Sequence, residues 1–179
     1  VVAGDRSQLR AAGQHRSDLM PYTPIIGCLG YVLSADGRRV LLVHRSRAGD
    51  QHAGKWNGLG GKLEPGEDVY TCLCRELSEE ADLEVTSARL RGTISWPGFG
   101  VGGEDWFGFV FVVDGWTGDP PERNEDGPLV WHDLDSLDDL PMWEGDRSWL
   151  PLVFGDGPTF HGVMPYVDGR PAGWSFTEP

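Results

Sequence analysis

The most informative segment of this sequence is residues 61–83, GKLEPGEDVYTCLCRELSEEADL, which combines a Pro-Gly turn with a cluster of glutamates. Within it, Glu76, Glu79 and Glu80 stand at i, i+3 and i+4, so on a helix their carboxylates project from one face. Like charges this close repel one another. Hard cations such as Mg²⁺ or Mn²⁺ prefer oxygen ligands and convert the repulsion into coordination. The spacing therefore predicts a metal site on a helix.

The opposite face of the same helix is apolar. Val69, Leu73 and Leu77 recur at four-residue spacing, which is typical of a helix face that packs against a core. We therefore expect the glutamates to face a cleft while these side chains are buried.

The segment before the helix is rich in glycine. The run 58–61 (GLGG) allows backbone amides and carbonyls, including the Gly60 carbonyl, to approach a ligand or metal, and Pro65-Gly66 favours a turn. Arg75 is placed to pair with Glu67 and to hold this loop against the helix.

These residues resemble the Nudix box: G, five residues, E, seven residues, then R-E-apolar-x-E-E-x-G-apolar. Every fixed position but one matches: Gly61, Glu67, Arg75, Glu76, Leu77, Glu79, Glu80 and Leu83. The departure is Asp82, where the family has a glycine that closes the helix in a left-handed conformation. Aspartate can adopt that conformation, so we expect a small cost in stability and no loss of catalysis. The resemblance implies an α/β/α sandwich with a central mixed sheet.

Composition agrees with one compact enzyme domain. The chain has 179 residues, of which 39% are hydrophobic, and no apolar run reaches the length of a membrane span. Residues 1–20 are polar and aperiodic, so we expect a disordered extension followed by the Nudix domain over residues 21–179. The amino-terminal segment lacks the apolar centre of a signal peptide, which predicts a cytoplasmic protein. We expect a monomer.

The net charge of −13 argues against binding to duplex nucleic acid, which requires clustered Lys and Arg. A nucleotide substrate is itself anionic, so local cations must help to bind it. Arg45, Arg47, Lys55 and Lys62 flank the box and are the candidates; the alternative is that they only keep the surface soluble.

Outside the box, the pattern predicts more strands than helices, as expected for a mixed sheet between helical layers. We expect short helices over 134–140 and 145–154 and a glycine-rich loop over 97–103. The expected strands are 25–33, 39–44, 88–96, 106–113 and 129–132, followed by a last hairpin formed by 160–167 and 173–176.

Further segments resemble the MutT-like branch of 8-oxo-dGTP diphosphatases, namely KWNGLGGK (55–62), PMWEGD (141–146), WLPL (149–152) and FHG (160–162). The resemblance implies that Asn57, Trp143 and Asp146 hold the purine base. Asparagine offers a donor and an acceptor, tryptophan a stacking face, and a carboxyl group an acceptor. The alternatives are a turn role for Asn57 and a packing role for Trp143. Gly145 stands where this branch has an acidic residue. This difference affects how many kinds of oxidised purine the pocket is expected to accept.

The expected mechanism follows from the metal site. Divalent ions held by Glu76, Glu79, Glu80 and the Gly60 carbonyl would clamp phosphate oxygens and activate water. The resemblance implies attack on an internal phosphorus, which yields a nucleoside monophosphate and pyrophosphate. The general base is a box glutamate or an acid from a distant loop, for which Glu125 is the first candidate and Glu122 and Glu104 are fallbacks.

Two other functions remain open from the sequence. The first is a Nudix hydrolase for ADP-ribose, a dinucleoside polyphosphate or the 5′ end of RNA. The second is a domain that senses nucleotides without turnover, although the intact set of glutamates argues against it.

Overall fold

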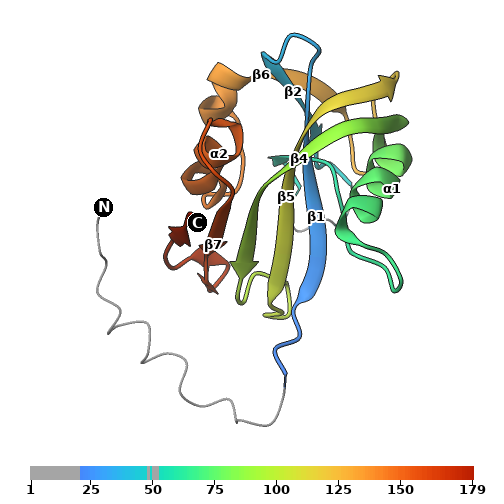
Figure 1. Cartoon of the computed structure of the whole chain (residues 1–179). Helices are drawn as coiled ribbons and strands as arrows, with labels where there is room; N and C mark the ends of the chain where they lie inside the picture. The colour runs from blue at the N-terminus through green and yellow to red at the C-terminus, as the bar shows by residue number, and fades with distance from the viewer. Residues whose placement is uncertain (1–20, 48, 50–52) are drawn as a thin grey trace.

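A computed structural model describes residues 21–47, 49 and 53–179. The expected extension over residues 1–20 lies outside the described residues. A mixed β-sheet lies between two helical layers, with α1 (Val69–Ala81) on one face and the 3₁₀ helix η1 (Leu134–Asp139) and α2 (Asp146–Phe154) on the other (Figure 1). This confirms the predicted α/β/α sandwich. No helix in the described part of the chain is long and apolar enough to cross a membrane.

The main sheet has the order β10-β7-β4-β5-β1-β2-β3, and β6 also pairs with β2. β1 and β5 are parallel, as are β4 and β7, and the other neighbours are antiparallel. A separate ribbon joins β8 to β9. The strands are β1 (Ile25–Leu33), β2 (Arg39–His44), β3 (Trp56–Asn57), β4 (Leu83–Trp96), β5 (Trp106–Gly118), β6 (Leu129–Asp133), β7 (Phe160–Val163), β8 (Tyr166–Val167), β9 (Arg170–Pro171) and β10 (Ser175–Thr177).

The glycine-rich segment before α1 is built into the sheet. β3 pairs with β2, and two residues later Leu59 exchanges backbone hydrogen bonds of 2.6 and 3.0 Å with Gly30 of β1. The next residue, Gly60, has φ 147°, and a Cβ there would overlap the Cys28 carbonyl oxygen. Only glycine fits this close approach of two backbones. The sheet therefore fixes the loop that precedes α1.

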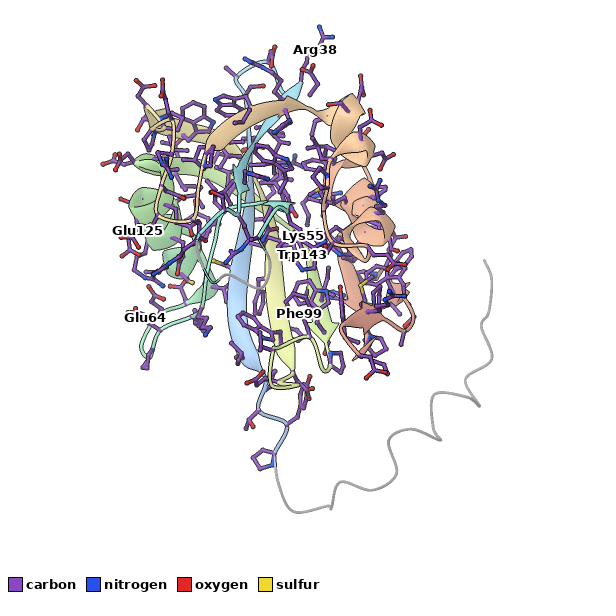
Figure 2. All side chains as sticks on the ribbon, turned by 180° about the vertical axis from the view of Figure 1, so that it is seen from behind. Arg38, Lys55, Glu64, Phe99, Glu125 and Trp143 are labelled. Atoms are coloured by element: carbon purple, nitrogen blue, oxygen red, sulfur yellow. The ribbon has the colours of Figure 1, made fainter. Side chains whose placement is uncertain are left out.

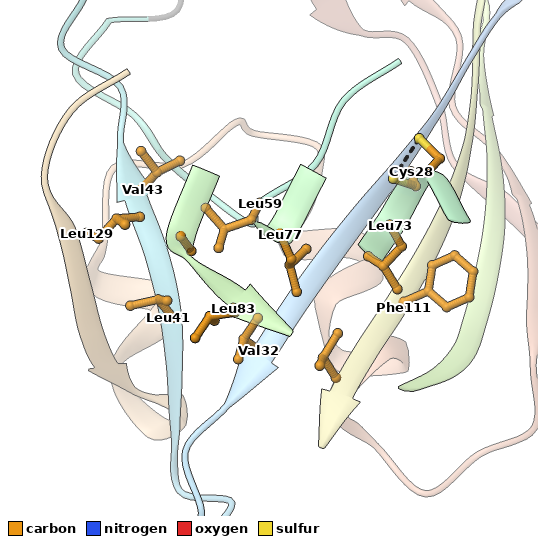
Figure 3. Packing of buried hydrophobic residues seen from close by; sticks show 13 residues of the cluster. Cys28, Val32, Leu41, Val43, Leu59, Leu73, Leu77, Leu83, Phe111 and Leu129 are labelled. Carbon is orange, nitrogen blue, oxygen red and sulfur yellow. Dashed lines mark hydrogen bonds between the residues drawn. The ribbon is translucent and has the colours of Figure 1, made fainter. Parts of the chain in front are cut away.

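Each helical layer covers its own hydrophobic core. The core under α1 contains Leu73 and Leu77 packed on Val32 of β1, with the Cys28 and Cys72 sulfur atoms 3.4 Å apart (Figure 3). The core under α2, on the opposite face of the sheet, contains Tyr31 of β1 and Trp149 of α2. Alternate residues of β1 thus face the two layers, as the period of a strand requires.

Three segments differ from the predicted elements. β4 begins at Leu83 and β5 continues to Gly118, because the two strands pair with each other, through bulges, beyond the predicted ends. β3 was not predicted, since two residues are too short to show a period. The expected last hairpin is two ladders, β7 with β10 and β8 with β9, separated at Pro165, which has no amide to donate.

Candidate functional site

Helix α1 begins and ends at aspartates. The Asp68 side chain caps the amino terminus by accepting from the amides of Tyr70 and Thr71 at 2.9 and 3.0 Å. Asp82 adopts the left-handed conformation, with φ 54°, and its amide donates to the Ser78 carbonyl. This is the conformation expected where the Nudix box has glycine, so the departure preserves the helix end.

Arg75 ties the loop to the glutamate face. Its Nε lies 2.6 Å from Glu67 Oε1, which confirms the expected pair, and its Nη1 donates to Glu76 at 2.9 Å and to Glu79 at 3.2 Å. The bonds from Arg75, together with the Glu64 amide, lower the pKa of Glu67 to about 2. Arg75 therefore orients three carboxylates and supplies their positive counter-charge.

Glu80 lies deeper than its neighbours. Its Oε2 accepts a hydrogen bond of 2.9 Å from the Gly60 amide, while burial, and the nearby charges of Glu76 and Asp126, raise the pKa of Glu80 to about 7. Gly60 thus touches the glutamates through its N–H, and the role of its carbonyl as a metal ligand stays a prediction. Because burial disfavours the charged form of Glu80, a cation bound nearby would stabilise its carboxylate.

A cavity of about 370 Å³, here named the acidic cavity, brings the predicted carboxylates together with Glu125. Two residues that sequence reasoning missed also line it: Asn124, whose Nδ2 donates to the Glu80 carbonyl at 3.1 Å, and Asp126. The lining residues are Arg47, Glu76, Glu79, Glu80, Asn124, Glu125 and Asp126.

The two fallback acids do not join this cavity. Glu104 lies in the β4–β5 loop and accepts from the Gly102 amide at 2.9 Å, and Glu122 lies outside the lining.

The donor set fits a hard divalent cation, because the acidic cavity offers carboxylate oxygens and no sulfur or imidazole ligand among the described residues. The same residues do not form a preformed chelate of three side chains. Arg75 holds Glu76 and Glu79, and the Gly60 amide holds Glu80, so side-chain rotation would have to accompany binding.

A second cavity, of about 350 Å³ and here named the aromatic cavity, contains five of the residues predicted to bind substrate: Asn57, Trp143, Asp146, Arg45 and Lys62. Arg47, another candidate cation, lines the acidic cavity instead. Sequence reasoning missed five of the six aromatic residues that line the aromatic cavity. They are Trp96, Phe99, Trp106, Trp149 and Tyr166. Trp96 ends β4 and Trp106 begins β5, on either side of the glycine-rich loop. This position could have marked them as residues of a cavity.

Lys55 and Lys62 lie against this wall. Lys55 Nζ lies 5.6 Å from the centre of the Trp143 ring and donates to the Met142 carbonyl at 3.1 Å, and Figure 2 shows Lys55, Trp143 and Phe99 on the side away from Glu125. Lys62 Nζ lies 5.5 Å from the centre of the Trp106 ring. Both ammonium groups therefore lie over the faces of aromatic rings, in cation–π contact.

Asp146 is buried at the first turn of α2. Burial raises its pKa to about 7, and the charge of Lys55 opposes that shift. Its Oδ2 has no hydrogen-bond partner, and neither do the buried Tyr31 hydroxyl and Trp149 Nε1. A buried carboxyl oxygen without a partner, on a residue that lines a cavity, is a strong candidate for accepting from a ligand donor.

The walls of the two cavities are linked by two side-chain contacts. Gly60 lines the aromatic cavity and donates to Glu80 of the acidic cavity. Arg45 also lines the aromatic cavity, and its guanidinium lies 3.1 Å from Asp126. A flat apolar group in one cavity can thus be continuous with an anionic group in the other.

Comparison with known proteins agrees with this geometry. The NUDIX domain model matches residues 22–153. An oxidized purine nucleoside triphosphate hydrolase of Danio rerio is 37% identical over 125 residues, which cover 70% of this chain and 78% of the relative. The uncharacterized Nudix hydrolase YvcI of Bacillus subtilis is 33% identical over 139 residues, covering 76% and 84%. The MutT protein structure from Bacillus halodurans superposes with a TM-score of 0.75 at 26% identity and covers 87% and 99% of the two chains.

Proposed function

The chain belongs to the Nudix hydrolase family, and we propose that it hydrolyses oxidised purine nucleoside triphosphates such as 8-oxo-dGTP to the monophosphate and pyrophosphate. The observation that supports this most is the aromatic cavity, which has Asn57 and Asp146 in its wall and is linked to the acidic cavity by the hydrogen bond from Gly60 to Glu80. A base fits the first and a metal-bound triphosphate the second. The oxidized purine nucleoside triphosphate hydrolases of Danio rerio and Mus musculus, 37% and 36% identical, support the same substrate.

In this proposal Glu76, Glu79, Glu80 and the Gly60 carbonyl hold Mg²⁺, with Mn²⁺ as an alternative. A divalent ion there would supply positive charge for the phosphate oxygens and acidify a water molecule. Arg75 keeps the glutamates in place, while Arg45 and Lys62 bind phosphate oxygens.

Glu125 lines the same cavity as the box glutamates and is the proposed proton acceptor for the attacking water. The water oxygen bonds to an internal phosphorus, the bond from that phosphorus to the bridging oxygen breaks, and pyrophosphate leaves.

At the base, Asn57 and Asp146 form hydrogen bonds and Trp143 contributes a stacking face. A base that leaves these groups unpaired is disfavoured, because buried polar groups lose their bonds to water.

The test is an initial-rate panel with Mg²⁺ at low micromolar substrate, in which pyrophosphate is scored apart from phosphate. It compares 8-oxo-dGTP, dGTP, 2-hydroxy-dATP, other nucleoside triphosphates, ADP-ribose and diadenosine polyphosphates. We expect a clear preference for an oxidised purine and release of pyrophosphate. Faster cleavage of ADP-ribose or a dinucleotide would overturn the substrate assignment, and tight binding without product would favour a sensor.

A further inference from the structure

Gly145 packs against Tyr166 at the wall of the aromatic cavity. A Cβ at Gly145 would overlap Met164 Sδ and lie 2.9 Å from the Tyr166 hydroxyl oxygen. The phenol therefore occupies the space that a side chain at 145 would fill, next to Asp146 in sequence. Both Asp146 and Tyr166 line the cavity.

The position of Tyr166 is fixed from several sides. Its amide donates to the Pro97 carbonyl at 2.7 Å, and its ring meets the Phe99 ring edge to face, with centres 5.0 Å apart. Its hydroxyl makes no hydrogen bond within the described ranges. Burial, with the charges of Asp146 and Glu144, raises the pKa of Tyr166, so the phenol keeps its proton and remains a donor.

The cavity wall thus presents an acceptor and a donor: the buried Asp146 Oδ2, which has no hydrogen-bond partner, and the Tyr166 O–H. A 2-amino-6-oxopurine presents two adjacent N–H donors followed by a carbonyl along its Watson–Crick edge. The two oxygens of a carboxylate suit the donors, and a phenol suits the carbonyl. A 6-aminopurine would turn a ring-nitrogen lone pair toward one carboxylate oxygen.

We propose that Tyr166 is a specificity-determining residue whose hydroxyl donates to the 6-carbonyl of a guanine-type base while Asp146 accepts from its N–H groups. This inference rests on the proposed function and narrows it to 2-amino-6-oxopurine nucleotides. Glycine at 145 is then required, because any side chain would displace the phenol.

The test is the isosteric variant Tyr166→Phe, assayed with 8-oxo-dGTP against 8-oxo-dATP and with dGTP against dATP. We expect kcat/KM to fall about tenfold for the guanine substrates, chiefly through KM, and less than about threefold for the adenine substrates. The matched control is Tyr70→Phe, which removes a hydroxyl from a half-exposed tyrosine on α1, away from both cavities. It should leave every rate unchanged.

Calorimetric binding of 8-oxo-dGMP and 8-oxo-dAMP to metal-free protein repeats the comparison without turnover. A tenfold loss confined to the guanine nucleotide supports the proposal. Equal losses, a larger loss for adenine, or no change would overturn it. Failure of the wild-type protein to cleave purine triphosphates would instead count against the proposed function, so the two failures are distinguishable.

Discussion

At the scale of single residues, the buried charge of Asp146 lowers the stability of the fold. Burial raises its pKa from the ordinary range near 4 to about 7, so the folded protein binds this proton more tightly than the unfolded chain does. The free energy of unfolding therefore falls as pH rises from about 4 to about 7, and above pH 7 the full cost of the buried charge is present.

We predict that Asp146→Asn raises the free energy of unfolding at pH 8 by about 2–4 kcal/mol, because the amide has the same shape and no charge. The gain should shrink toward pH 4.5, and the variant should lose base selectivity. Urea unfolding of both proteins at the two pH values measures this. An equal difference at both pH values would contradict the assignment of the buried charge.

For the glutamate face, we predict that Glu79→Gln and Glu80→Gln each lower kcat at least about a hundredfold, because an amide removes the ligand charge that a divalent cation requires. The control is Glu64→Gln, which alters an exposed carboxyl in the loop before α1. Steady-state rates with the preferred triphosphate measure kcat for each of these variants. Normal turnover in both variants would rule out this face as the metal site.

At the scale of elements, α2 depends on a buried arginine of β4. Arg91 donates from Nε to the Val153 carbonyl at 2.9 Å, and from Nη2 to the carbonyls of Leu152, Gly155 and Gly157 at 3.1, 2.7 and 3.0 Å. These bonds satisfy carbonyls at the end of a helix, where no amide of the helix can reach them.

Arg91→Lys should therefore lower the free energy of unfolding by about 2–3 kcal/mol, because one ammonium group cannot replace the planar guanidinium against four carbonyls. Arg89→Lys is the matched control two residues earlier on the same strand, in a mostly exposed pair with Asp114, and should cost less than about 1 kcal/mol. Urea unfolding curves of the wild-type protein and the two variants measure these free energies. Similar costs for the two variants would show that Arg91 has no special role.

The elements differ in how far the sequence predicts them. α1 was predictable because Leu73 and Leu77 mark its buried face over several turns, and β1 because its apolar run is long. β3 was not, because Trp56 and Asn57 become a strand only through pairing with β2. Such pairing depends on residues distant in sequence, which a local pattern does not contain.

The same limit applies to the site. The box glutamates, Asn57 and Asp146 stand at spacings that a motif records. Trp96 and Tyr166 are 70 positions apart, and only the parallel pairing of β4 with β7 brings their segments to one cavity. Among the eight tryptophans of the chain, no local feature distinguishes those that line it.

At the scale of the whole molecule, the chain carries a net charge of −13, and the carboxylates of the acidic cavity repel one another when no metal ion is bound. We predict that Mg²⁺ at about ten times its dissociation constant adds about 1.4 kcal/mol to the free energy of unfolding. For a domain of this size the melting temperature should rise by about 3–5 °C.

Differential scanning calorimetry with and without a chelator measures this effect independently of turnover. Glu79→Gln and Glu80→Gln should reduce the shift, and Tyr166→Phe should preserve it. A shift of equal size in all four proteins would place the bound ion elsewhere.

The division of the site into two cavities has a consequence for divergence among relatives. The carboxylates of the acidic cavity come from α1 and the segment 124–126, whereas most aromatic rings of the other cavity come from the β4–β5 hairpin, α2 and β8. Substitutions in the second set can therefore accumulate after gene duplication without disturbing the hydrolytic chemistry. A descendant copy can acquire a new nucleotide as its substrate through changes at a few aromatic positions, while selection maintains the same glutamates.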